Sequence, residues 1–150
     1  MTCFLADAML GRLAKWLRIL GFDTLYGARW DDNELARVSR AEGRVLLTRD
    51  VELARRRGLR VLFITQEDLE PQLAEVLAAY PLPADQLFSR CPVCNVPLED
   101  IPKDQAWGQV PPYVFRTQER FRQCPGCGRF YWQGTHWQAM RARLAELGHL

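Results

Sequence analysis

The sequence of 150 residues has no long hydrophobic run, so no membrane-spanning segment is predicted. Its longest apolar runs are only a few residues, such as Val61 to Ile64. The first residues, Met1 to Asp7, contain neither a basic segment nor a long apolar segment, so no secretory signal is predicted. We therefore expect a cytoplasmic protein with no membrane partner.

Lysine is also scarce, because only Lys15 and Lys103 are lysines among the 20 basic residues. Arginine supplies nearly all the positive charge, and its planar guanidinium group suits phosphates. The net charge of +2 includes no basic tail, so charge alone does not indicate a nucleic-acid partner. The content of 48% apolar and 25% charged residues excludes a disordered or fibrous chain and suits one compact domain, or one domain plus a small module.

Several nucleotide-binding and catalytic motifs are missing from the sequence. It has no Walker A motif, no GxGxxG after the first predicted strand and no nucleophile elbow. These absences argue against a P-loop hydrolase, a dinucleotide-dependent enzyme and a serine hydrolase of the α/β type.

Short apolar runs alternate with helical patterns over the first 80 residues. Strands are predicted over 3–6, 24–26, 45–48 and 60–64, and helices over 10–20, 32–42, 51–57 and 67–80. Strands that alternate with helices predict a parallel sheet flanked by helices, hence an α/β fold. Pro81 and Pro83 mark a linker, and a last helix is predicted over 136–147. We predict an α/β domain over 1–83 and a second module over 88–150.

Four of the five cysteines form two Cys-x-x-Cys pairs, Cys91 with Cys94 and Cys124 with Cys127. Zinc prefers four tetrahedral ligands and binds thiolates well, so this spacing predicts a zinc ribbon with a structural zinc. Four cysteines close the coordination shell and leave no open position for substrate. Neither pair begins a helix in a βαβ setting, which argues against a thioredoxin-like role. His136 lies near the second pair, as a spare ligand or as a locally packed side chain.

Acidic residues stand where the predicted strands and helices meet. Asp7 follows the strand 3–6, Asp50 follows the strand 45–48, and Asp32 opens the helix 32–42 as its predicted N-cap. Active crevices of parallel sheets lie beyond the carboxyl ends of the strands. Clustered carboxylates there favour magnesium or manganese, which support phosphodiester hydrolysis. Each aspartate has a second interpretation as a helix cap only, because Asp is a preferred N-cap residue.

Basic and aromatic residues are interleaved around the second cysteine pair, among them Arg122, Arg129 and Trp132. Arginines bind phosphates and aromatic rings stack on unpaired bases, so this pattern is typical of RNA contact. The same aromatics suit the core of a small ribbon equally well. Arg12 and Lys15 lie on the polar side of the first predicted helix, as a phosphate-binding surface or as a solvated face.

Three blocks of the sequence resemble a known family. They are Phe4 to Asp23 with its Leu-Ala-Asp-Ala and Leu-Gly-Phe-Asp segments, Gly43 to Asp50, and the two cysteine pairs with the stretch Tyr131 to Trp137. These blocks resemble the Mut-seven C-terminal RNase-type family, a PIN-like domain fused to a zinc ribbon. The resemblance implies a PIN-like nuclease fold in which Asp7, Asp32 and Asp50 hold a divalent metal, and it implies RNA cleavage.

We therefore predict a ribonuclease that uses magnesium or manganese at Asp7, Asp32 and Asp50, with a structural zinc at the four paired cysteines. The predicted substrate-binding residues are Arg12, Lys15, Arg49, Arg122 and Arg129. RNA is the expected partner. Two alternatives stay open, a non-catalytic RNA-binding module and a protein-interaction module with a protein partner.

Overall fold

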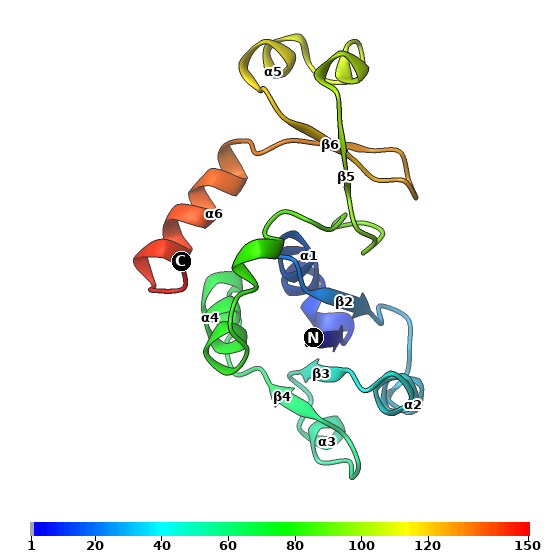
Figure 1. Cartoon of the computed structure of the whole chain (residues 1–150). Helices are drawn as coiled ribbons and strands as arrows, with labels where there is room; N and C mark the ends of the chain where they lie inside the picture. The colour runs from blue at the N-terminus through cyan, green and yellow to red at the C-terminus, as the bar shows by residue number, and fades with distance from the viewer. Residues whose placement is uncertain (1) are drawn as a thin grey trace.

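A four-stranded parallel sheet forms the centre of the N-terminal part of the protein in a computed structural model, which describes residues 2–150 (Figure 1). Its strands are β1 (Cys3–Ala6), β2 (Asp23–Tyr26), β3 (Val45–Thr48) and β4 (Val61–Phe63). They lie in the order β2-β1-β3-β4, and each neighbouring pair is parallel. The α/β fold class predicted from the sequence is confirmed.

Helices cover both faces of this sheet. On one face lie α1 (Gly11–Ile19) and α4 (Leu69–Ala79), and on the other lie α2 (Asp32–Glu42) and α3 (Val51–Ala54). Successive strand residues point to opposite faces, so Phe4 and Ala6 enter the first core while Leu5 enters the second. Because both faces are buried at the centre of the sheet, β1 and β3 are nearly continuous apolar runs instead of alternating patterns.

Two predicted details of the helices are wrong. Asp31, not Asp32, is the N-cap of α2, since its carboxylate accepts a hydrogen bond from the Glu34 N–H at 2.8 Å. Both residues are aspartates, and the sequence pattern does not distinguish them. The helix predicted over 51–57 ends at Ala54, and the chain then turns toward β4 through Gly58, whose φ is +77°.

The C-terminal part contains a three-stranded antiparallel sheet of β5 (Glu99–Ile101), β6 (Phe121–Gln123) and β7 (Phe130–Tyr131). Helix α5 (Pro112–Thr117) lies in the excursion between β5 and β6. A small core of Ala106, Val110, Val114 and Phe121 supports this ribbon, and Phe115 and Trp132 pack against it. Several of the ribbon's aromatic residues therefore belong to its core, which is one of the two roles that the sequence suggested for them.

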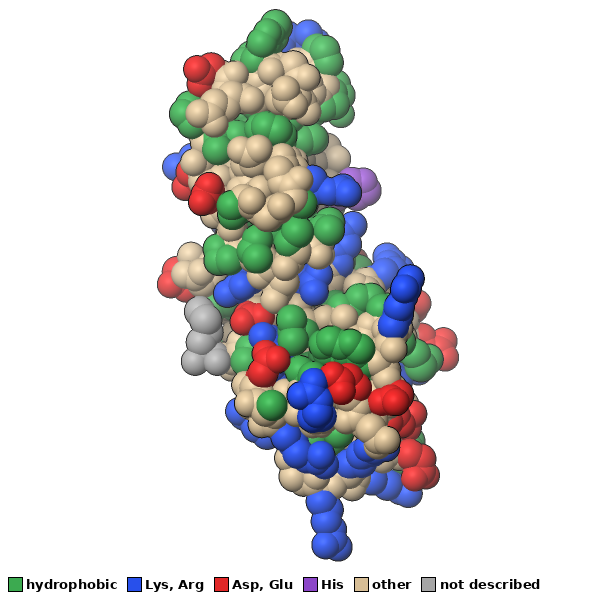
Figure 2. All heavy atoms as spheres, turned by 90° about the vertical axis from the view of Figure 1, so that its right-hand side faces the viewer, with side chains coloured by type: hydrophobic (Ala, Val, Ile, Leu, Met, Phe, Trp, Pro, Cys, Tyr) green, Lys and Arg blue, Asp and Glu red, His purple; other side chains and the backbone are tan. Residues whose placement is uncertain are grey.

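The last helix, α6 (Thr135–Glu146), returns to the N-terminal part beside α4 (Figure 1). Its Trp137, Met140 and Leu144 are buried in the same core as α1 and α4. The predicted boundary between domains at 83–88 stays a prediction, and α6 joins the two parts across it. Figure 2 shows Lys and Arg side chains gathered where the ribbon meets the α/β part. Among residues 2–150, no helix is long and apolar enough to cross a membrane.

Candidate functional site

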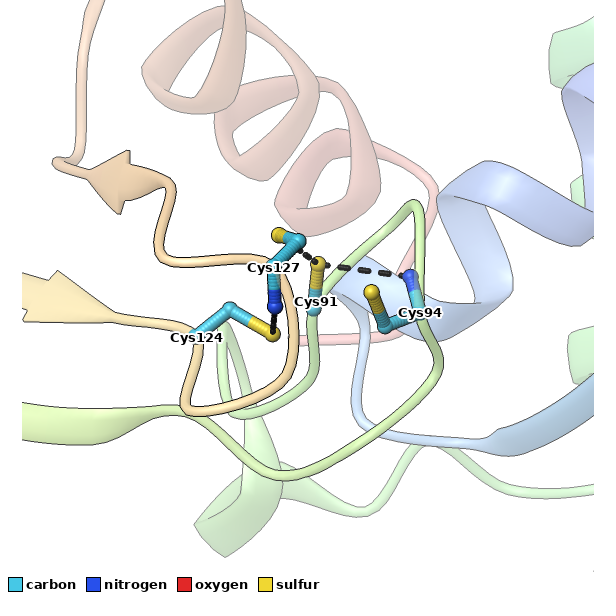
Figure 3. A group of neighbouring side chains, drawn as sticks. All are labelled: Cys91, Cys94, Cys124 and Cys127. Carbon is cyan, nitrogen blue, oxygen red and sulfur yellow. Dashed lines mark hydrogen bonds between the residues drawn. The ribbon is translucent and has the colours of Figure 1, made fainter.

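The four paired cysteines lie together in two loops, one before β5 and one between β6 and β7 (Figure 3). Their sulfur atoms all lie within 4.8 Å of one another, and the Cys91 and Cys127 sulfurs are 3.9 Å apart. A tetrahedral zinc with bonds of about 2.3 Å would place its sulfur ligands roughly 3.8 Å apart. A disulfide needs a distance of about 2.05 Å, and all five cysteines are free. The donor set and its spacing fit zinc.

Hydrogen-bond donors surround the sulfurs of this group. The N–H groups of Cys94 and Cys127 point at the Cys91 and Cys124 sulfurs, each at 3.4 Å, and the Tyr131 hydroxyl lies 3.1 Å from the Cys91 sulfur. Burial opposes ionisation of Cys91, but the bonds from Tyr131 and from backbone N–H groups outweigh it and lower its pKa to about 7. Burial and the neighbouring sulfurs instead raise the pKa of Cys94 and of Cys124, because charge on one sulfur opposes charge on the next. Thiolates are the form that binds metal, so the donors around Cys91 favour a metal site there.

The first cysteine pair docks on the edge of the parallel sheet. Asn95, just after Cys94, accepts a hydrogen bond from the Thr24 N–H at 3.0 Å, and its φ is +65°. Arg18 donates to the Thr24 carbonyl at 2.8 Å and to the Pro92 carbonyl at 2.9 Å. Strand β2 is an edge strand, and an uncovered edge invites pairing with other chains. The ribbon therefore covers this edge.

A polar cluster lies beneath that contact. Asp23 accepts hydrogen bonds from Asn95 at 2.7 Å and from Arg44 at 2.9 Å, and Arg44 also donates to the Phe4 carbonyl at 3.1 Å. Burial opposes ionisation of Asp23, but the bonds from Arg44 and Asn95 outweigh it and lower the pKa of Asp23. The ionised carboxylate therefore links the sheet to the ribbon.

We expect this cluster to make stability depend on acid pH. The pKa of Asp23 is lower in the folded protein than in the unfolded chain, where it is about 3.9. Its contribution is therefore complete above the unfolded pKa and is lost as the pH falls through the folded pKa. Urea unfolding at a series of pH values should show a weaker loss of stability in acid for Asp23→Asn than for the wild type. Asp104→Asn, at an exposed position in the ribbon, is the matched control. Parallel curves for wild type and Asp23→Asn would contradict this prediction.

Asp7 and Asp50 stand at the carboxyl ends of two neighbouring strands, β1 and β3. The chain leaves β1 for β2 on one side and enters β3 on the other, so ligands are expected to bind between these strands. The Thr48 hydroxyl donates to the Asp7 carboxylate and accepts from the Asp50 N–H at 2.9 Å. Thr48 thus ties the two aspartates together, with Asp7 only 5% exposed and Asp50 facing solvent.

Both aspartates also cap helical turns. The Asp7 carboxylate accepts from the Met9 N–H at 3.0 Å, and the Asp50 carboxylate accepts from the Leu53 N–H at 3.1 Å. An ionised carboxylate has about four acceptor positions, so these bonds leave lone pairs for a cation. Asp32 is half-buried in the first turn of α2, the helix that follows β2. Within residues 2–150 the cysteines alone form a group of metal-ligating atoms within 4.8 Å, so the catalytic role of the three aspartates stays a prediction.

The structure places the five predicted substrate-binding residues in three locations. Arg12, Lys15 and Arg129 are exposed and line one cleft. Arg122 is half-buried, and its guanidinium donates to the Phe88 carbonyl and to the Asp100 carboxylate, so the structure uses it to hold β6. Arg49 lies near the aspartates, with its guanidinium 4.0 Å from Glu67. His136 is exposed and lies outside the four-cysteine group.

The chain matches the Mut7-C RNAse domain over residues 2–144. It belongs to this family. The match covers the parallel sheet and the cysteine group together, and it confirms the resemblance seen in the sequence. No curated protein and no solved structure gave a match. Membership in the Mut7-C RNAse domain family supports a ribonuclease-type function.

Sequence reasoning missed the groups that position the cysteines and the aspartates of the two candidate sites in this Mut7-C RNAse domain. Thr48 had one available signal, since a hydroxyl residue ends a strand whose neighbour carries Asp7. The sequence offers no signal for Tyr131, whose partner Cys91 lies 40 residues away, or for Asn95, whose partner Thr24 lies 71 residues away. Contacts of that kind are set by the fold and leave no local spacing pattern.

Proposed function

We propose that this Mut7-C RNAse domain is a divalent-metal-dependent ribonuclease that hydrolyses RNA phosphodiester bonds at the carboxyl edge of its parallel sheet. The observation that carries the proposal is the pair of carboxylates at the adjoining ends of β1 and β3, tied together by Thr48. Family membership supports the ribonuclease-type activity, and the strand order places the expected ligand crevice beside these carboxylates. On the same grounds we propose that the fold is PIN-like.

Asp7, Asp32 and Asp50 would hold magnesium or manganese, since hard carboxylate oxygens are the donors these ions prefer. When bound, such an ion lowers the pKa of water and offsets negative charge on the phosphate oxygens. Hydrogen bonds from Thr48 and Met9 fix the direction of the buried Asp7 carboxylate. The exposed Asp50 carboxylate faces the side from which RNA would arrive.

We propose a structural role for zinc in the ribbon. Four sulfurs close its coordination shell, so it would hold the two cysteine pairs together and take no part in hydrolysis. Through Asn95 and Arg18 the first of these pairs fixes the ribbon against β2. The ribbon would thereby present its basic residues to RNA along the outer face of α1, the helix that begins close to the carboxyl ends of the strands.

The test is cleavage of labelled RNA, single-stranded and structured, by zinc-loaded protein. We expect cleavage when magnesium or manganese is added and none when the divalent ion is left out. Omission is a better baseline than EDTA, because a chelator also strips zinc from thiolates. Cleavage that is independent of added metal would contradict the proposal. Binding without cleavage under every metal condition would favour the non-catalytic RNA-binding module. The cleft lined by Arg12, Lys15 and Arg129 supports that alternative.

A further inference from the structure

A cleft of about 880 Å³ lies between the α/β part and the ribbon. One wall is the outer face of α1, and the others come from the cysteine loops, α5 and the start of α6. Ligand clefts usually measure about 300–1,000 Å³, so this one lies near the upper end.

The charge of this cleft has one sign. Its lining includes Arg12, Lys15, Arg90, Arg129 and His136, and it includes no aspartate or glutamate. Within residues 2–150, Arg12, Lys15 and Arg129 form no ion pair with a carboxylate. Basic side chains gathered in a concave site focus a positive field, which attracts anions. The cleft is therefore complementary to a chain of phosphates.

Aromatic side chains stand among these basic groups. Tyr113 on α5 is 63% exposed, and Trp16 and Trp132 are partly exposed and pack against the two neighbouring cores. Phe88 and Trp137 also line it, but they are buried against each other with ring centroids 5.4 Å apart. Exposed rings within a basic groove form the usual binding surface for unpaired bases. A duplex keeps its bases stacked inside, so it offers nothing to these rings.

The cleft leads toward the proposed catalytic edge. Arg12, Trp16 and His136 also line a second hollow of about 580 Å³. It includes Asp68 and Glu70 at the start of α4, and Glu70 is paired with Arg143 at 3.0 Å. Helix α1 begins four residues after Asp7, so Arg12 lies at the end of the cleft nearest the carboxylates. A bound strand that leaves the cleft along Arg12 would arrive at the ends of β1 and β3.

We propose that this cleft binds a single-stranded RNA segment and delivers it to the carboxylate edge. Arg12, Lys15 and Arg129 contact its phosphates, and Tyr113, the most exposed ring of the cleft, stacks on its bases. The inference rests on the proposed function, because it names the substrate class and the path to the same site. It leaves Arg122 out, since the Phe88 carbonyl and Asp100 occupy that side chain.

The test measures binding of a labelled oligouridylate by fluorescence anisotropy, with zinc-loaded protein and no magnesium or manganese. We expect Lys15→Ala with Arg129→Ala to weaken binding at least tenfold. We also expect the negative slope of log K against log salt to become shallower by about 1.4, as the loss of two phosphate contacts requires. Tyr113→Ala should weaken binding about fivefold to a hundredfold through lost stacking, with little change in the salt slope. All these side chains are exposed, so the variants should fold.

Two controls match these variants. Arg55→Ala with Arg57→Ala removes the same charge from exposed positions outside the cleft, and Trp107→Ala removes a ribbon aromatic that is 70% exposed and does not line it. Controls that weaken binding as much as the cleft variants would overturn the proposal, as would equal affinity for a blunt RNA duplex. Because no catalytic metal is present, absence of cleavage activity does not affect this result. The nuclease proposal and the cleft proposal therefore fail separately.

Discussion

Removal of the metal from the four-cysteine site is expected to unfold the ribbon. The ribbon's own core has only four buried hydrophobic residues, Ala106, Val110, Val114 and Phe121, and its strands are two or three residues long. Structural zinc contributes about 10–16 kcal/mol in small zinc-finger peptides, which is more than a core of this size supplies. Metal-free protein, or Cys124→Ser, should lose amide protection across β5, β6 and β7 in hydrogen exchange.

The same experiment has a sharp local readout at Thr24. Its N–H is bonded to the Asn95 side chain, which the first cysteine pair holds in place. Release of the metal should therefore make the Thr24 amide exchange quickly, while amides of the central strands β1 and β3 stay protected longer. Cys3→Ser is the matched control, because Cys3 lies in β1 outside the metal group. It should keep one zinc per chain, and equal protection of the ribbon with and without metal would contradict the prediction.

The fold followed from patterns that are local in the sequence. Val45 to Thr48 is a short apolar run between Gly43 and Arg49, and all four residues are buried as β3. The cysteine spacing likewise predicted a group that the structure brings within 4.8 Å. The signal for each strand and for each cysteine pair lies within a few residues, while the two pairs, Cys94 and Cys124 being 30 positions apart, are brought together by the ribbon's fold.

The partners of individual side chains were not predictable in the same way. Arg122 has the sequence context of a free cation, but the Phe88 carbonyl 34 residues away accepts its hydrogen bond. Asp31 and Asp32 are chemically equal candidates for a helix cap, and the backbone conformation at Asp31 decides between them. Residue type therefore indicated which groups bear chemistry, while the packing of distant segments decided which of them remain available to a ligand.

Replacement of Asp50 by Asn is expected to lower RNA cleavage by about 10³-fold, which corresponds to about 4 kcal/mol of transition-state stabilisation. The change removes one negative charge from the proposed metal site and keeps the shape of the side chain. Asn is also a good N-cap, so its oxygen can still accept the hydrogen bond from the Leu53 N–H. The free energy of unfolding should therefore change little. A lower rate of cleavage, measured with manganese present, would then report a loss of chemistry and not a loss of folded protein. RNA binding without added metal should persist.

Asp31→Asn is the matched control for this loss. Asp31 caps α2 as Asp50 caps α3, with a carboxylate that accepts from Glu34 N–H at 2.8 Å, and it is not among the proposed ligands. Asp7→Asn should abolish cleavage as well, but it places an amide against two donors, Met9 N–H and the Thr48 hydroxyl, and so costs about 1–2 kcal/mol of stability. Asp50 is the cleaner probe for that reason. Full activity in Asp50→Asn, or an equal loss of activity in Asp31→Asn, would contradict hydrolysis at the carboxylates at the ends of β1 and β3. The basic cleft would then be the protein's functional surface.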